Sequence, residues 1–376
     1  MRTLFVIGPG GAGRTTLAAA TAAAAGARAL LLTADSTPDP GDGVTVTRTS
    51  PTTHFREELL ALQARATTAL DLFGARPLDE DELTPLPGAE ELALLKAIRD
   101  AHRSEAYDLL VVDLPPTRRA LAALALPAEL RRYVRRLLPP ERQAARALRP
   151  VLAQLAGVPM PAQWLYDSAA QWDADLAGVQ GVIESTETAV RVVAEPGPAG
   201  TDALRTAVTG LALHGLRIER VLANRVLPQG SADPWLASLA GQQGKALVQW
   251  RGDGLPVAEV GHLGRDPLDA GDVAALGVPA PLEAPPGGEW EVEDRLAEDG
   301  VLEWRIPLPG AVKEELDLVR RGDEVIVTVG EFRRIVPMPS GLRRCSVAGA
   351  GLREGTLGIR FTPDPGLWPE GRRGAT

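Results

Sequence analysis

The chain has 376 residues, and its 49 acidic residues outnumber its 40 lysines and arginines, for a formal net charge of −9. This length allows two domains with a substantial core, and the acidic balance argues against a general nucleic-acid-binding protein. The single cysteine, Cys345, excludes an internal disulfide and any zinc site built from several cysteines. No apolar run reaches the roughly 20 residues of a membrane span, and none fits a signal peptide. We therefore expect a cytoplasmic protein.

A glycine-rich stretch near the N-terminus is the most informative part of the sequence. An apolar run at residues 3–7 predicts a buried strand, and residues 17–25 predict a helix. A glycine-rich turn between a strand and a helix is the context of a phosphate-binding loop, in which backbone N–H groups and the helix N-terminus hold phosphate. The residues predicted to bind nucleotide in this way are Gly8, Gly10, Gly11, Ala12, Gly13, Arg14, Thr15 and Thr16.

Two positions of this loop decide its chemistry. Thr15 stands where the hydroxyl of a phosphate-binding loop holds Mg²⁺, and Arg14 stands where the preceding lysine is expected. The chain contains only three lysines, so Arg14 could simply reflect its composition. We rank that explanation second, because lysine is a compact point charge whereas arginine is a wide planar fork. The motif is therefore stronger evidence for phosphate-loop ancestry than for hydrolysis.

Two further predicted strands end in an acidic residue. Residues 29–35 and 107–113 are apolar runs typical of buried parallel strands, and they end in Asp35 and Asp113. Asp113 has the Walker B pattern, so it would position the water of a bound metal. Asp35 has two interpretations of about equal weight: a catalytic residue, or an acidic residue at a strand-end turn without a catalytic role.

The middle of the chain is predicted to be helical. Amphipathic patterns cover residues 55–72 and 90–103. A later helix carries four arginines on one side, which we interpret as a solvated face, with contact to acidic lipids as the minority alternative: Arg131, Arg132, Arg135 and Arg136. An apolar stripe follows, at Leu148, Val151, Leu152 and Leu155.

The last third of the chain changes character. Strands are predicted at residues 188–193 and 219–224, with a helix over 202–214 between them. Residues 278–288 are rich in proline and glycine, which is typical of a linker. The strands that follow lack a long intervening helix, and two of them alternate apolar with polar residues, so they predict an antiparallel sandwich: residues 302–306, 324–329 and 358–361.

Taken together, the motifs resemble the ArsA-type ATPases, a family that includes arsenite-pump motors and targeting factors for tail-anchored membrane proteins. The loop is similar to G-K-G-G-V-G-K-T-T, with Pro9 and Arg14 in place of the two lysines. In that family the first lysine reaches the partner's nucleotide across a homodimer, and the second contacts phosphates in its own subunit. The resemblance implies that Asp35 orients the attacking water. The segment after Asp113 resembles D-T-A-P-T-G-H-T-L, but Arg118 and Arg119 replace Gly and His.

The resemblance continues toward the C-terminus. Residues 224–228 resemble V-N-x-x-L-P, which implies that Asn224 reads the adenine edge, although an asparagine at a strand end can also be a plain turn former. The turn at residues 194–197 resembles T-x-P-E, with Gly197 in place of Glu. Residues 307–310, 315–318 and 350–357 resemble the α-crystallin domain of small heat-shock proteins, and a subgroup of the ArsA-type proteins carries such a tail.

The resemblance implies a fold and a domain organisation. We expect an α/β fold with a P-loop NTPase-like, mostly parallel sheet and a helical insertion, followed by a small all-β α-crystallin-like sandwich. The expected limits are residues 1–280 for the nucleotide-binding domain, with a helical subdomain at approximately 128–180. A linker at 281–288, the sandwich at 289–363 and a tail at 364–376 follow.

The resemblance also implies a function. We expect ATP or ADP with Mg²⁺ as ligands if nucleotide binding is retained, with Asp35 in a catalytic role and Thr15 and Asp113 at the metal. Because both cationic positions are changed, we expect a weak or inactive ATPase that binds, chaperones or targets hydrophobic or membrane client proteins. The alternative is an active ATPase of the pump-motor or tail-anchored-targeting type.

The expected partners follow from the same resemblance. We expect a homodimer, or a heterodimer with a related ATPase, a hydrophobic or tail-anchored client, no nucleic acid, and at most peripheral contact with a membrane. The lone cysteine excludes the cysteine-triad arsenite site of the pump motors and the zinc-linked dimer of some targeting factors. Three methionines in the whole chain do not support a flexible methionine-rich client groove.

Overall fold

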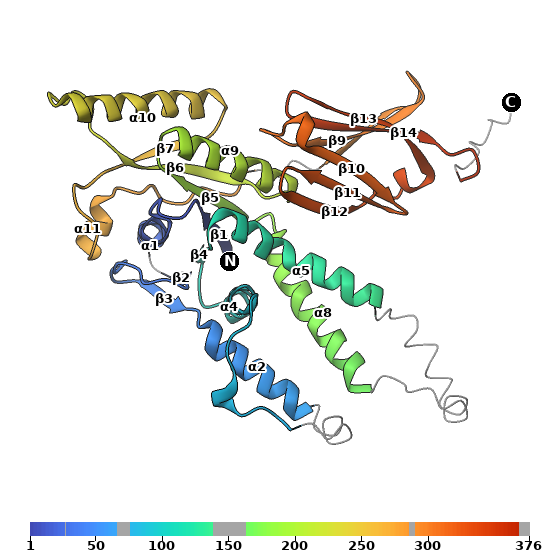
Figure 1. Cartoon of the computed structure of the whole chain (residues 1–376), viewed down its shortest axis with the longest axis horizontal. Coiled ribbons are helices and arrows are strands. Elements are labelled where there is room, and N and C mark those ends of the chain that lie inside the picture. Colours follow the sequence, from blue (N-terminus) through green and yellow to red (C-terminus); the bar gives the residue numbers. More distant parts are fainter. Residues whose placement is uncertain (27, 66–75, 138–162, 286–289, 368–376) are drawn as a thin grey trace. The chain divides into compact units, whose positions relative to one another are not determined.

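The computed structural model describes residues 1–26, 28–65, 76–137, 163–285 and 290–367. It divides into two compact units, one formed by Met1–Thr188 with Val260–Leu282 and the other by Ala189–Glu259 with Glu283–Thr376. Seven strands form one parallel sheet in the order β3-β2-β4-β1-β5-β6-β7, and two smaller antiparallel sheets follow in the chain (Figure 1). This arrangement confirms the predicted fold class. The domain limits given above remain a prediction.

The first unit contributes four neighbouring strands to the parallel sheet. They are β1 (Arg2–Ile7), β2 (Ala29–Thr33), β3 (Val44–Arg48) and β4 (Leu109–Asp113). All of β2 and β4, and β1 from its second residue on, are buried. Parallel strands covered on both faces read as continuous apolar runs, which is why the sequence located these three. Four of the five residues of β3 are exposed, and its residues form no continuous apolar run.

Helices of the first unit flank these strands (Figure 1). They are α1 (Arg14–Ala25), α2 (Pro51–Arg65), α4 (Ala89–Ser104), α5 (Thr117–Leu137), α8 (Gln163–Ile183) and α11 (Ala270–Ala275), with a short 3₁₀ turn η1 (Glu80–Glu82). The helices predicted at 55–72 and 90–103 correspond to α2 and α4. The predicted extension of the first of them to residue 72 lies outside the described residues, as do the apolar stripe at residues 148–155 and the end of the C-terminal tail.

The arginine-rich side of α5 differs from its prediction as a solvated face. In Figure 1 α5 and α8 run alongside each other. Arg131 donates from Nε to Asp173 Oδ1 of α8 over 3.0 Å, and Arg135 donates from Nη2 to Asp173 Oδ2 over 3.2 Å. Hydrogen bonds from the two arginines lower the pKa of Asp173 against the opposing effect of its burial. The arginines therefore hold two helices together, an interaction that the spacing within one helix could not reveal.

The second unit begins with two parallel strands and a connecting helix. These are β5 (Thr188–Ala194), α9 (Pro198–Leu213) and β6 (Ile218–Val226), and α10 (Pro234–Gly252) and β7 (Val257–Gly261) follow them. The buried ring of Trp250 in α10 donates from Nε1 to Thr201 Oγ1 of α9 over 2.9 Å. An internal ion pair joins β5 to β6: Arg191 donates from Nε and Nη2 to the two carboxylate oxygens of Glu219 at 3.1 and 3.0 Å.

The C-terminal part of the second unit is an antiparallel sandwich. One sheet has the order β10-β11-β12 and the other the order β13-β14-β9-β8. Their bounds are β8 (Glu291–Arg295), β9 (Val301–Pro307), β10 (Leu316–Arg321), β11 (Glu324–Val329), β12 (Phe332–Pro337), β13 (Cys345–Arg353) and β14 (Thr356–Pro363), with 3₁₀ turns η2 (Lys313–Glu315) and η3 (Leu342–Arg344). Alternate residues of β9 and β14 are buried, as their alternating pattern predicted, and alternate residues of β11 are buried as well.

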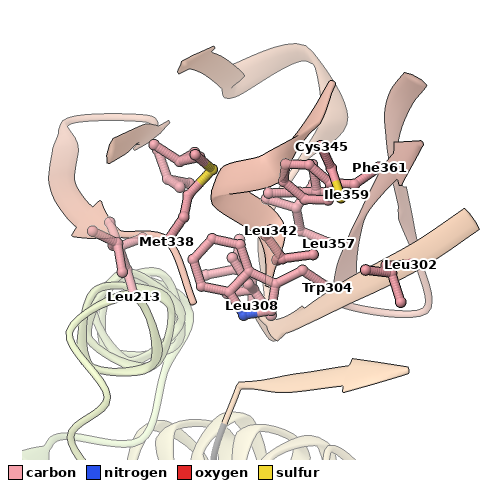
Figure 2. Packing of buried hydrophobic residues seen from close by; sticks show 14 of the residues in the cluster. Leu213, Leu302, Trp304, Leu308, Met338, Leu342, Cys345, Leu357, Ile359 and Phe361 are labelled. Atoms are coloured by element: carbon pink, nitrogen blue, oxygen red, sulfur yellow. The ribbon is translucent and has the colours of Figure 1, made fainter. Parts of the chain in front are cut away.

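The core of this sandwich includes a residue of the helix α9. Leu213, fully buried at the end of α9, belongs to the same apolar cluster as Trp304, Leu308 and Met338 (Figure 2). Polar contacts accompany it, since Arg334 of β12 donates from Nη1 to the carbonyl oxygen of Leu213 over 2.8 Å. The sandwich therefore shares its core with the preceding part of the second unit.

Candidate functional site

The loop between β1 and α1 has the backbone of an anion cradle. Gly11 and Gly13 adopt φ angles of +83° and +84°, which favour glycine over residues with a side chain. No atom lies within 4 Å of the position that a Cβ on Gly10 or Gly11 would take, so the space beside the loop is open. The first turn of α1 has no side-chain cap. Because uncapped N–H groups at a helix start attract anions, the loop fits a phosphate group.

Arg14 is the first residue of α1, and its guanidinium lies between two carboxylates. Its Nε donates to Asp113 Oδ1 over 2.7 Å, and its Nη2 donates to Asp35 Oδ2 over 3.4 Å. The Arg14 side chain is 10% exposed and that of Asp113 is 1% exposed, whereas Asp35 is 61% exposed. The contact with Asp113 is therefore a shielded ion pair with a short hydrogen bond, and the contact with Asp35 is a longer, solvated one.

Thr33 connects the ends of the two strands that carry these acidic residues. Its hydroxyl donates to Asp113 Oδ2 over 2.9 Å and accepts the Asp35 backbone N–H over 3.1 Å. The register of β2 with β4 pairs Leu32 with Val112, which brings the next residues, Thr33 and Asp113, to the same sheet edge. Sequence reasoning missed Thr33. Its only signal was a buried polar residue at the end of an apolar strand.

A cavity of about 190 Å³ adjoins this network. Arg14, Asp35 and Asp113 line it, together with Glu90 and Glu91 at the start of α4 and Arg119 of α5. Arg119 is hydrogen-bonded to both glutamates, at 2.8 Å from Glu91 Oε1, and these bonds raise the pKa of its guanidinium. The sequence pattern predicts only that Glu90 and Glu91 lie at the start of a helix. The structure places them on the wall of the cavity that the predicted site residues share.

The predicted site residues of the first unit come together, and Thr33 joins them. Gly8, Ala12 and Thr16 belong to the loop and its helix, and the Gly8 carbonyl accepts the N–H of Thr117 over 3.2 Å. The Thr15 hydroxyl donates to Asp35 Oδ2 over 3.5 Å. Asn224, the remaining predicted residue, is buried in β6 of the second unit. Its proposed contact with adenine, and the roles assigned to the other residues, remain predictions.

The same residues fit a phosphate better than they fit a metal ion. Both oxygens of Asp113 already accept hydrogen bonds, one from Arg14 and one from Thr33. The Thr15 hydroxyl donates to Asp35. Within the described residues, no group of three or more His, Cys, Asp or Glu side chains is placed to hold a metal. A magnesium ion would have to compete with the Arg14 guanidinium for Asp113, so the residues as arranged do not form a metal site.

No helix within the described ranges has the length and apolar character needed to cross a membrane. This finding leaves the proposed peripheral membrane contact untested.

Comparisons with known proteins identify relatives. The family profile of the anion-transporting ATPases matches residues 1–251, and the profile of an HSP20-like domain found in ArsA matches residues 299–361. An uncharacterized protein of Streptomyces coelicolor is 59% identical over 99% of this chain and 100% of its own length. A protein of Mycobacterium tuberculosis, Rv2184c, is 33% identical over 77% of this chain and 71% of its own. A candidate arsenical pump-driving ATPase of Aquifex aeolicus is 26% identical over 72% of this chain and 71% of its own. The chain therefore belongs to the ArsA family of anion-transporting ATPases and carries the HSP20-like C-terminal domain found in that family.

Proposed function

We propose that this protein binds ATP or ADP through its altered phosphate loop, hydrolyses ATP weakly or not at all, and acts in binding, chaperoning or targeting hydrophobic or membrane client proteins. One observation supports weak or absent hydrolysis. The guanidinium of Arg14 is bound to Asp113 at 2.7 Å and lies near Asp35 at 3.4 Å. The cation of the loop is thus engaged by the two acidic residues expected to serve the metal and the attacking water.

This arrangement separates phosphate binding from phosphoryl transfer. Phosphoryl transfer depends on positioned charge around the transferred group, and losing one such charge typically costs about 10² in rate or more. Here Pro9 supplies no charge, and Arg14 is held by carboxylates. The backbone cradle of Gly10, Gly11 and Gly13 does not depend on either side chain. We therefore expect nucleotide binding to be retained although hydrolysis is lost.

An active ATPase is the second candidate, because Thr15, Asp35 and Asp113 are all present. Arg14 would then have to leave Asp113 when nucleotide binds. The short, shielded contact between Arg14 Nε and Asp113 Oδ1 weighs against this candidate.

The client-binding part rests on the HSP20-like domain. Its two sheets end in edge strands, such as β10 and β12 of the smaller sheet. Edge strands offer unpaired backbone groups to an extended partner segment. We propose that such a segment of a hydrophobic client docks there, that the protein works as a dimer with itself or with a related ATPase, and that it acts in the cytoplasm.

Nucleotide binding is expected to raise the melting temperature of the protein. At a nucleotide concentration of about 100 times its Kd, the bound state gains about 2.7 kcal/mol. For a unit of this size each kcal/mol shifts the melting temperature by about 2–4 °C, so the expected shift is about 5–11 °C. The measurement is thermal unfolding with and without ADP or ATP in the presence of Mg²⁺.

Two glycines of the first unit provide a matched pair of variants. Gly11→Ala and Gly26→Ala place a Cβ at similar φ angles of +83° and +82°, with no atom within 4 Å in either case. Both substitutions place a side chain at a positive φ, but only Gly11 lies in the loop. We expect Gly11→Ala to lose the nucleotide-induced shift and Gly26→Ala to keep it. An unmodified protein that shows no shift with millimolar nucleotide would contradict the proposed nucleotide binding.

A further inference from the structure

The Arg14–Asp113 contact bears on which form of nucleotide the loop accepts, a question that rests on the proposed nucleotide binding. A magnesium-dependent phosphate loop needs an acidic residue that is available to the metal through water. Asp113 is 1% exposed, and each of its oxygens accepts a hydrogen bond from a neighbouring side chain. The Arg14 guanidinium therefore already occupies the place at Asp113 where a divalent cation is expected.

Arg14 has donors left over for a ligand. A guanidinium carries five N–H donors in one plane. One of them, on Nε, is given to Asp113, and one, on Nη2, is given to Asp35. The remaining donors make no hydrogen bond to the described residues. Since Asp113 fixes the plane of the group through Nε, the outer edge with Nη1 and Nη2 is preorganised for a second acceptor.

The ligand that suits this edge is a phosphate group. Arginine binds phosphate through two parallel N–H···O bonds and remains charged at any physiological pH. The loop carries no lysine, so the phosphates of a nucleotide in the cradle would find Arg14 as the side-chain cation of the loop. The Asp35 contact is long and solvated, and a phosphate oxygen can replace it at little cost.

We infer that this site binds a nucleoside di- or triphosphate without requiring a magnesium ion, because Arg14 bridges Asp113 and the phosphates in place of the metal. The protein then recognises the phosphates by the charge and geometry of Arg14 rather than through a coordinated metal. Arg14 sets the specificity, because it keeps its hold on Asp113 through Nε while its other nitrogens contact the ligand. A lysine at this position has one nitrogen and cannot bridge in the same way.

The test measures the affinity of the full-length protein for ADP by calorimetry, once with excess Mg²⁺ and once with EDTA. For the unmodified protein we expect the two Kd values to agree within about threefold. For Arg14→Lys we expect Mg²⁺ to tighten binding by about tenfold or more, because the freed Asp113 becomes available to the metal. Arg28→Lys is the control, since Arg28 pairs with Asp108 on the surface of the same unit, and it should behave like the unmodified protein.

The unmodified protein alone decides the inference, so an Arg14→Lys variant that fails to fold leaves the test intact. Binding that weakens by about tenfold or more in EDTA overturns the inference and leaves the proposed nucleotide binding standing. Binding that fails in both buffers overturns the proposed nucleotide binding and this inference with it. Equal binding in both buffers supports the inference.

Discussion

Replacing Glu219 by glutamine is expected to lower the free energy of unfolding of the second unit by about 3–5 kcal/mol. Arg191 and Glu219 lie on the adjacent strands β5 and β6, and both side chains are 0% exposed. Burial lowers the pKa of Arg191, although the glutamate opposes this shift. Glutamine keeps the shape of the partner but removes the negative charge that faces both Arg191 and Arg220. The measurement is the urea-unfolding midpoint.

Two further variants give this prediction its controls. Glu259→Gln is the same substitution at an exposed pair with Arg251 in the same unit, and it should cost about 1 kcal/mol or less. The double variant Arg191→Met with Glu219→Leu removes both charges and should be far less harmful than Glu219→Gln, or even stabilising by about 1–4 kcal/mol. If Glu219→Gln costs no more than Glu259→Gln, the buried ion pair does not contribute the stability expected here.

Replacing Leu213 by alanine is expected to destabilise the sandwich by about 2–5 kcal/mol, although the residue lies on α9. Leu213 is 0% exposed and belongs to the apolar cluster of the sandwich. Other contacts between α9 and the sandwich should keep the two from closing over the cavity left by the substitution. Thr209 Oγ1 donates to the Pro309 carbonyl over 2.8 Å, and a Cβ on Gly310 would approach Thr209 Oγ1 to 2.8 Å. Burial and the nearby Arg334 lower the pKa of His214 to about 4, so this adjoining side chain is neutral at neutral pH.

The readout is hydrogen exchange of the sandwich strands, which should quicken in Leu213→Ala. Val248→Ala, at a 70% exposed position of α10, is the control and should change stability by less than about 0.5 kcal/mol. Unchanged exchange in Leu213→Ala would show that the sandwich is stable without α9. Ending the chain at residue 288 then tests the proposed client role: aggregation of a model client should be suppressed less well than by the full chain. Equal suppression would leave the domain only a bracing role.

The sequence predicted those parts of the fold that depend on local pattern. The buried strands β1, β2 and β4 are continuous apolar runs, and the loop between β1 and α1 follows from glycine spacing. The strand β3 was not predicted, because Val44–Arg48 is an edge strand with four exposed residues and has no continuous apolar pattern. The solvated-face interpretation of the α5 arginines was wrong for Arg131, whose side chain is 17% exposed, but Arg135 is 58% exposed. Asp173 of α8, which both arginines contact, lies 38 or more residues away.

In the candidate site, too, local motifs were predictable and tertiary contacts were not. Arg14, Asp35 and Asp113 were each identified from a motif, and parallel strands bring their carboxyl ends to one edge. What no motif contains is the direction of the Arg14 side chain. That direction depends on Asp113, 99 residues away, on the hydroxyl of Thr33 at the end of β2, and on how closely β4 approaches α1. Tertiary packing decides these contacts, and spacing along the chain does not encode them.

The rate of ATP hydrolysis shows whether Arg14 and Pro9 leave a nucleotide site with little or no turnover. We expect the unmodified protein to hydrolyse ATP at a rate near the buffer background. Pro9→Lys combined with Arg14→Lys should raise the rate by about tenfold to a hundredfold, since one positioned charge is worth on the order of 10². Adding Asp35→Asn should abolish the gain. Turnover of the unmodified protein at about 1 s⁻¹ or faster, the ordinary range for enzymes, would contradict the account.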